Sequence, residues 1–176
     1  MHRALTISAM LLILVACSQG NEANSTATAA TDTATATSTS APNVPPPPVV
    51  VTVQNSPRYG QVLADGTGRS LYIFMKDKPA QGSACTGDCA NEWPPLVASQ
   101  QPNGGSGVDA SKLGTIDRPD ATKQVTYSGW PLYRNKDDKA PGDTKGEGVK
   151  GFGAEWYLIS PAGTQIEKSG AKTGSS

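Results

Sequence analysis

Residues 71–77 read Leu-Tyr-Ile-Phe-Met-Lys-Asp, and residues 132–138 read Leu-Tyr-Arg-Asn-Lys-Asp-Asp. In both stretches a tyrosine precedes an aspartate by five positions, in the pairs Tyr72 and Asp77, then Tyr133 and Asp138. A tryptophan follows each copy at a similar spacing. Internal repetition indicates copies of one supersecondary unit that each bury only one face. We therefore expect one small domain of two degenerate repeats with pseudo-twofold symmetry.

The apolar runs around the repeat are short and end in turn residues, which is typical of β structure. Three segments read as strand, turn, strand: 61–74, 124–133 and 156–166. One short helical turn is expected at 87–92, and no stretch has a long helical apolar period. The sequence therefore predicts an all-β domain of β-hairpin repeats over residues 49–168, followed by a disordered tail at 169–176.

The N-terminus reads as an export signal, with a basic start and a short apolar run over residues 1–16. The segment Leu14-Val15-Ala16-Cys17 resembles the bacterial lipobox, which implies cleavage before Cys17 and its modification by fatty acyl chains such as palmitate. Several acyl chains anchor a protein stably to a membrane. Residues 17–48, rich in Ser, Thr, Ala and Pro, predict a disordered tether that holds the domain in the cell envelope.

The residue after the lipidated cysteine indicates to which membrane a Gram-negative lipoprotein is sorted. Ser18 stands there, where an aspartate tends to retain lipoproteins in the inner membrane. Its absence favours the outer membrane, or the periplasmic face, in a Gram-negative cell. Removal of the signal takes away Arg3 and no acid, so the mature chain is slightly negative and lacks a basic footprint for nucleic acid.

The motifs are recognisable. The first copy carries a Tyr-x-aromatic-x-x-Asp motif in Tyr72, Phe74 and Asp77. Elsewhere the pattern consists of Ser83-Ala84-Cys85-Thr86-Gly87-Asp88-Cys89-Ala90, Trp93-Pro94-Pro95-Leu96, Arg118, Asp120, Gln124-Val125-Thr126-Tyr127, Gly129, Pro131-Leu132-Tyr133, Asp138, Pro141-Gly142-Asp143 and Trp156. Over residues 59–163 the chain resembles the bacterial lipoprotein family described as a secreted repeat of unknown function.

Two positions depart from the family pattern. Asn135 replaces the motif aromatic, and Ala121 stands where a glycine usually follows Asp120. The first departure weakens any claim that both copies bind alike. The resemblance implies little about activity, because the family has no settled biochemistry.

Cys85 and Cys89 are the thiols left once Cys17 is acylated. In an oxidising compartment a disulfide is the default, and α-carbons one helical turn apart are within its reach. The bond would pin the loop that leads to Trp93. A redox pair is the alternative, although Cys-x-x-x-Cys is not the usual spacing and no cation lies close in sequence to lower a thiol pKa.

The aromatic residues are numerous for so small a domain. Burial in the core is the simpler interpretation for Tyr72, Phe74, Trp93, Tyr133 and Trp156, which recur at matching repeat positions. An exposed platform that stacks on sugar rings or packs on a protein is the alternative. Trp130, beside a Ser-Gly turn, is the best candidate for such a platform.

Acidic residues gather in the loops after both motifs. Asp77, Asp137, Asp138, Asp143 and Glu147 could supply oxygen ligands to calcium, but no Asp-x-Asp-x-Asp-Gly loop is present. We expect Asp77 and Asp138 instead to accept backbone hydrogen bonds where each motif strand ends. A carboxylate pair acting as a glycosidase is formally open, but no pair stands out.

The only histidine is His2, inside the signal segment, so the mature chain has no imidazole for catalysis or metal binding. We predict no enzyme, no metal site and no cofactor. The expected function is a non-enzymatic binding or scaffolding module, held to the membrane by its lipid, with an envelope polysaccharide or another envelope protein as partner. A redox accessory lipoprotein using Cys85 and Cys89, and a calcium-stabilised adhesion module, are the alternatives.

Overall fold

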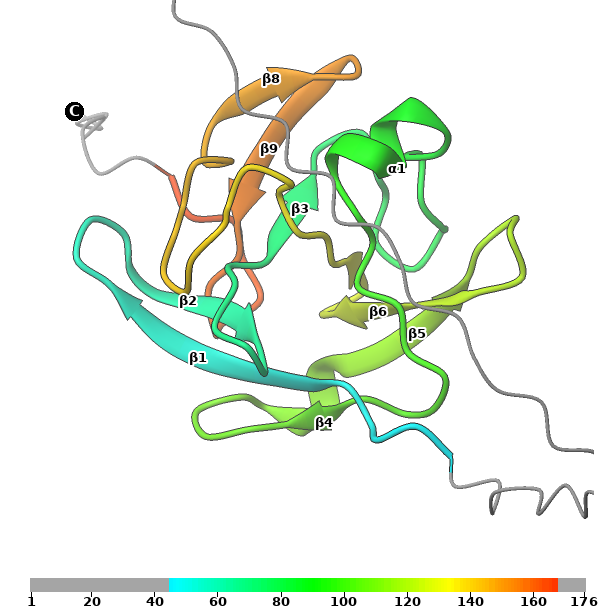
Figure 1. The fold of residues 1–176 in the computed structure, drawn as a ribbon, viewed down its shortest axis with the longest axis horizontal. Coiled ribbons are helices and arrows are strands. Elements are labelled where there is room, and N and C mark those ends of the chain that lie inside the picture. The colour runs from blue at the N-terminus through cyan, green and yellow to red at the C-terminus, as the bar shows by residue number, and fades with distance from the viewer. Residues whose placement is uncertain (1–44, 168–176) are drawn as a thin grey trace, which may run out of the picture. The chain divides into compact units, whose positions relative to one another are not determined.

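Strands dominate residues 45–167, the part of the chain that the computed structural model describes (Figure 1). They form three small sheets, accompanied by one α-helix and one 3-10 helix. The all-β prediction is confirmed for these residues. The signal segment, Cys17, residues up to 44 and residues 168–176 lie outside the described residues, so the predictions made for them are not addressed.

The first sheet has the order β2-β1-β4. β1 (Val50–Ser56) pairs antiparallel with β2 (Gly60–Asp65) and parallel with the two-residue β4 (Asn103–Gly104). The chain reverses between β1 and β2 through Gly60, whose φ of 72° suits a residue without a Cβ. Sequence analysis did not predict β1.

The second sheet has the order β3-β9-β8 and pairs a strand of the first repeat with strands of the second. β3 (Tyr72–Phe74) pairs antiparallel with β9 (Ala154–Leu158), and β9 pairs with β8 (Val149–Gly151). The register places Phe74 opposite Trp156. This pairing joins the first repeat to the second.

The third sheet has the order β5-β6-β7. β5 (Leu113–Asp117) follows the 3-10 helix η1 (Ala110–Lys112) and pairs antiparallel with β6 (Lys123–Tyr127), which pairs with β7 (Trp130–Pro131). The β6–β7 hairpin confirms the prediction for residues 124–133.

The other two predicted hairpins fare differently. At 156–166 the chain turns back as expected, with a bridge between Ile159 and Gln165. At 61–74 the turn forms, and Ser70 bridges back to Ala64, but β3 then leaves β2 and pairs with β9. The expectation of a full 61–74 hairpin is therefore wrong, because a distant strand provides the partner for β3.

Single bridges and hydrogen bonds join the sheets. The amide of Leu63 donates to the carbonyl of Ile159, and Tyr72 and Tyr133 form a bridge between the second and third sheets. One core cluster lies under the first and third sheets around Leu71 and Tyr127. The second contains the motif aromatics and both cysteines, and this cluster holds the candidate site.

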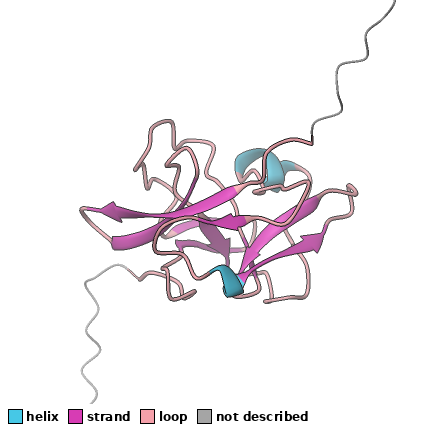
Figure 2. Cartoon of the chain, turned by 90° about the horizontal axis from the view of Figure 1, so that it is seen from below, coloured by secondary structure: helices cyan, strands magenta, loops and turns pink. Residues whose placement is uncertain are grey.

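The helix α1 (Asp88–Glu92) confirms the predicted helical turn. A disulfide between Cys85 and Cys89, whose Cα atoms are 5.2 Å apart, ties its first turn to the preceding loop. The amide of Trp93 donates to the carbonyl of Cys89 and ends the helix. Seen from below, the two short helices lie outside the strands, on opposite sides of them (Figure 2).

No helix among the described residues has the length and apolar character to cross a membrane.

Candidate functional site

The motif tyrosines reach across from one repeat to the other. The hydroxyl of Tyr72 donates to Asp138 at 2.6 Å, and the hydroxyl of Tyr133 donates to Asp77 at 2.6 Å. The backbones of the two tyrosines also exchange hydrogen bonds, at 2.9 and 3.0 Å. Each repeat therefore supplies the acceptor for the tyrosine of the other. We call these four residues the tyrosine–aspartate clasp.

Each aspartate of the clasp also closes the loop that follows it. Asp77 accepts the amide of Ala84 at 2.7 Å, and Asp138 accepts the amide of Lys145 at 2.9 Å. The expectation that these carboxylates accept backbone hydrogen bonds is confirmed. The loop lengths are the same, seven residues from aspartate to amide, in both repeats.

The clasp lies in the interior, and burial controls its protonation. All four side chains are buried. Burial, reinforced by the neighbouring carboxylates, raises the pKa of Tyr72 and of Tyr133 far above the usual value for a phenol. Burial also raises the pKa of Asp77, against the lowering effect of its hydrogen bonds to Tyr133 and Ala84. The phenols are therefore neutral hydrogen-bond donors at physiological pH.

A second polar network extends the clasp from Tyr133. Ser83 Oγ and Tyr133 OH are 2.6 Å apart, and Arg118 Nη1 donates to Ser83 Oγ at 3.0 Å. The guanidinium also donates to Gln124 Oε1 at 2.6 Å and to the carbonyl of Cys85 at 2.8 Å. Arg118 thus joins the third sheet to the loop that carries the disulfide.

Sequence reasoning assigned no role to this network. Ser83, Arg118 and Gln124 were all visible as parts of the family pattern, but none was assigned a role. The available signal was an arginine flanked by strand residues, since a buried guanidinium requires several acceptors. Asp120 lies 3.6 Å from Arg118 Nε and completes its surroundings.

The predicted core aromatics stack on one another. The rings of Trp93 and Trp156 are parallel with centroids 4.0 Å apart, and Phe74 covers the other face of Trp156 at 4.1 Å. Tyr72 meets Trp93 edge-on, and Tyr133 meets Trp156 edge-on. All five side chains are buried, which confirms the core interpretation. Such pairs stabilise beyond the area that they bury.

Trp130 differs from these five. It is half-buried in β7 and packs against the cluster around Leu71 and Tyr127. Part of its surface therefore already has protein neighbours, and only the remainder is available as a platform.

The acidic loop residues are used separately. Asp143 accepts the amides of Lys139 and Ala140 and pairs with Lys145, while Glu147 accepts the amide of Leu158 at 2.6 Å. Within residues 45–167, no group of three His, Cys, Asp or Glu side chains lies close enough to hold a metal ion. The structure does not bring the five candidate calcium ligands together.

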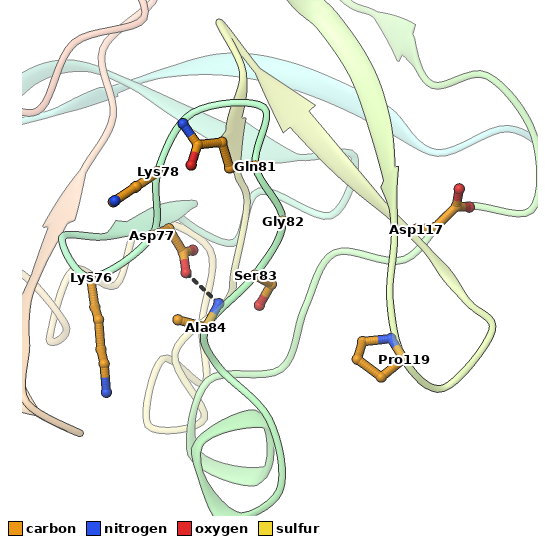
Figure 3. A pocket seen from close by; sticks show the side chains of 9 residues that line it. All are labelled: Lys76, Asp77, Lys78, Gln81, Gly82, Ser83, Ala84, Asp117 and Pro119. Atoms are coloured by element: carbon orange, nitrogen blue, oxygen red, sulfur yellow. Dashed lines mark hydrogen bonds between the residues drawn. The ribbon is translucent and has the colours of Figure 1, made fainter.

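A pocket of about 410 Å³ opens beside the clasp (Figure 3). Its lining consists of Lys76, Asp77, Lys78, Gln81, Gly82, Ser83, Ala84, Asp117 and Pro119. The hydroxyl of Ser83 is already bound by Tyr133 and Arg118. Burial raises the pKa of Tyr133, so its hydroxyl stays protonated and takes part in this network as a hydrogen-bonding group.

A second pocket, of about 480 Å³, lies between α1, the second motif loop and the β8–β9 hairpin. Its lining consists of Asp88, Glu92, Trp93, Asn135, Asp137, Lys145, Val149, Lys150, Gly151 and Phe152. This lining combines an exposed phenylalanine with carboxylates, an amide and lysines. Such a mixture suits ligands that present both polar and apolar faces.

The fold and the clasp define an all-β protein made of two copies of one Tyr–Asp motif, closed by hydrogen bonds between the copies. The chain belongs to the family described as a secreted repeat of unknown function, whose model matches residues 55–97 and 114–160. The two matches cover the two repeats expected from the sequence. Comparison with curated proteins and with solved structures finds no match.

Proposed function

We propose that the chain is a non-enzymatic binding or scaffolding module of the cell envelope. The observation that carries this proposal is that the tyrosine hydroxyls and aspartate carboxylates of the motif bind one another. Tyr72, Tyr133 and Asp138 are buried and line neither of the two pockets. Asp77 does line the 410 Å³ pocket, but it is 4% exposed and already accepts from Tyr133 and Ala84. A general base must instead reach the proton of its substrate.

The composition of the chain supports the same proposal. The only histidine is His2, inside the segment that reads as a removable signal. The chain that remains would carry no imidazole to act near neutral pH. Both pockets are lined mainly by side chains that bind through hydrogen bonds and charge.

We propose that Cys17 carries the lipid anchor and that residues 17–48 form the tether. The lipobox-like segment supports acylation, and the family description as secreted is consistent with an envelope location. The membrane is then the first partner, and an envelope polysaccharide or another envelope protein is the second. The outer membrane is the expected site in a Gram-negative cell.

A pseudo-twofold relation between the repeats is part of the proposal. The reciprocal bonds of the clasp and the equal loop closures at Ala84 and Lys145 support it. The stacking of Trp93 on Trp156, which occupy matching places after the motifs, supports it too. Because the two repeats differ in sequence, as at Phe74 and Asn135, the surface that each repeat presents to solvent would differ too.

We propose a structural role for the disulfide. Cys85 is fully buried and Cys89 is 5% exposed, both within the aromatic cluster. A redox pair that exchanges with other thiols must be reached by them, so burial favours the structural role over the redox alternative.

A thermal-melting screen of the purified full chain tests the proposed function. The ligands are envelope polysaccharides, calcium with a chelator control, haem and redox buffers. A ligand at about 100 times its dissociation constant adds about 2.7 kcal/mol to the free energy of unfolding, which raises the melting temperature measurably. A shift with a polysaccharide supports a binding module. Cofactor-free turnover of an envelope substrate, lost on mutating one carboxylate, would overturn it.

A further inference from the structure

The second repeat lacks the aromatic that completes the first. In the first motif, Phe74 stacks on Trp156 with centroids 4.1 Å apart and planes 10° apart. Asn135 occupies the matching position of the second motif. Trp93 stacks on Trp156 from the other side, so an aromatic at 135 would be the counterpart of Phe74 at the Trp93 end of the stack.

The 480 Å³ pocket is lined by both Trp93 and Asn135. The position where the two repeats differ therefore lies at this pocket. Asn135 is itself 7% exposed, and its Oδ1 accepts the amide of Asp137 at 2.7 Å. Its Nδ2 makes no hydrogen bond to another described residue, and Asn135 lines the pocket, so this amide is available as a donor to a ligand.

The β8–β9 hairpin supplies an aromatic wall. Phe152 lies at its tip and is 42% exposed, with Val149 also exposed beside it. Its φ of 55° places a bulky residue in the left-handed region, where side chains with a Cβ are strained. A residue held in this conformation with its ring in solvent is a candidate for binding.

The polar lining has free acceptors. Glu92 pairs with Lys136, and Lys150 pairs with Glu155 at 3.1 Å. By contrast, the carboxylates of Asp88 and Asp137 make no salt bridge or hydrogen bond with another described residue. Two free carboxylates, an amide donor and an exposed ring provide acceptors, a donor and an apolar face within one pocket.

We propose that this pocket binds a saccharide unit of an envelope glycan. The inference rests on the proposed binding function and names its ligand class. Sugar hydroxyls donate to the free carboxylates and accept from Asn135, while the apolar face of the sugar ring packs on Phe152. Lys145 and Lys150 in the same lining are already paired with Asp143 and Glu155. The carboxylates of Asp88 and Asp137 therefore leave the pocket negative on balance. This disfavours acidic sugars, and the ligand is a neutral or amino sugar.

The test is titration of the full chain with three probes: an N-acetylglucosamine oligomer, a neutral glucan oligosaccharide and the acidic polygalacturonate. Chemical shifts of the backbone amides report binding and its location. We expect one of the first two probes to shift the amides around Asn135 and Phe152, and polygalacturonate to shift none.

Two substitutions locate the site. Asn135→Phe places an aromatic at this position and fills the pocket, so it abolishes binding. It also removes the acceptor of the Asp137 amide, so a melting curve checks that the variant is folded. Phe152→Asn keeps a residue that tolerates the left-handed conformation but removes the ring, and weakens binding about tenfold. Trp130→Phe, on another sheet, is the matched control and leaves binding unchanged.

The outcomes separate this inference from the proposed function. Sugar binding that survives both Asn135→Phe and Phe152→Asn, or no binding to either non-acidic probe, overturns the saccharide pocket. A melting shift with another envelope ligand would still uphold a binding module in that case. Turnover of a bound sugar overturns the non-enzymatic proposal, but the inference that this pocket binds a saccharide still stands. If Asn135→Phe fails to fold, Phe152→Asn decides.

Discussion

Tyr72 donates a hydrogen bond of 2.6 Å to Asp138, 66 residues further along the chain and in the opposite repeat. In the other direction, Tyr133 donates a hydrogen bond of 2.6 Å to Asp77 in the first repeat. The family motif thus joins the two copies in the core. Because all four side chains are buried, a group that loses its partner cannot bond to water instead. Its residues explain cohesion of the domain, and the ligand must be sought on surfaces where the copies differ.

Tyr72→Phe is expected to lower the free energy of unfolding by about 2 kcal/mol. The substitution removes a hydrogen bond to a buried carboxylate, and such bonds to charged groups contribute about 1.5–3 kcal/mol. Urea denaturation measures the change. Tyr157→Phe is the control, because Tyr157 is half-buried and its hydroxyl has no partner among the described residues. Equal effects of the two substitutions would contradict the clasp.

Stability should fall steeply in alkali. Burial raises the pKa of Tyr72 and Tyr133 above the usual phenol value of 10.0. At a pH between the pKa of the unfolded chain and that of the folded chain, the folded chain holds protons that the unfolded chain has released. The stabilisation is complete below pH 10.0 and is lost as the pH rises above it. Denaturation at several alkaline pH values measures the slope, and the double variant Tyr72→Phe/Tyr133→Phe should flatten it. An unchanged slope would show that other groups titrate.

The sequence predicts the motif but not its partners. The spacing of Tyr72 and Asp77 is the same as that of Tyr133 and Asp138, and nothing in this spacing says which aspartate each tyrosine reaches. The crossing arises because β3 pairs with β9 and Tyr72 bridges Tyr133, and both contacts are distant in sequence. Local turn signals predicted the reversal after β2 correctly and the partner of β3 wrongly, since a turn does not determine which strand follows as neighbour.

The candidate site was predictable in part. Core aromatics and the disulfide followed from composition and spacing, because burial and oxidising conditions act on residue type. The Ser83–Arg118–Gln124 network depends on geometry between separate loops. The substitution at Asn135 was visible in the sequence but did not predict a pocket, because one wall of the pocket is the β8–β9 hairpin, which the sequence did not predict.

Arg118→Lys is expected to lower the free energy of unfolding by about 2–3 kcal/mol. Lysine keeps the charge but cannot donate simultaneously to Ser83, Gln124 and the carbonyl of Cys85, so buried acceptors lose their donors. Lys123→Arg, whose ammonium forms an exposed pair with Asp117, serves as the control and should change stability little. Urea denaturation of both variants checks the prediction. If Arg118→Lys leaves the free energy of unfolding unchanged, the network does not stabilise the fold.

The disulfide should resist reductant while the chain is folded. Cys85 and Cys89 are buried among aromatic rings, so a thiol reagent reaches them only after local opening. With Cys17 acylated or replaced by serine, thiol titration after treatment with a mild reductant should detect no free thiol in buffer and both thiols in denaturant. The loop is short, so Cys85→Ala/Cys89→Ala should cost about 2 kcal/mol. Ready reduction and reoxidation of the native chain would favour the redox alternative.

Ala121→Gly is expected to stabilise the domain by about 0.5–1 kcal/mol. Ala121 has a φ of 62° in the β5–β6 turn, where the family usually has glycine, and the left-handed region costs alanine about 1–2 kcal/mol. Glycine removes this strain but gains entropy in the unfolded chain, which offsets part of the benefit. Ala162→Gly is the control, an exposed turn residue without positive φ, and should lose a few tenths of a kcal/mol. Opposite shifts of the two urea midpoints would attribute the effect to backbone strain, whereas losses in both variants would mean that the turn at Ala121 is relaxed.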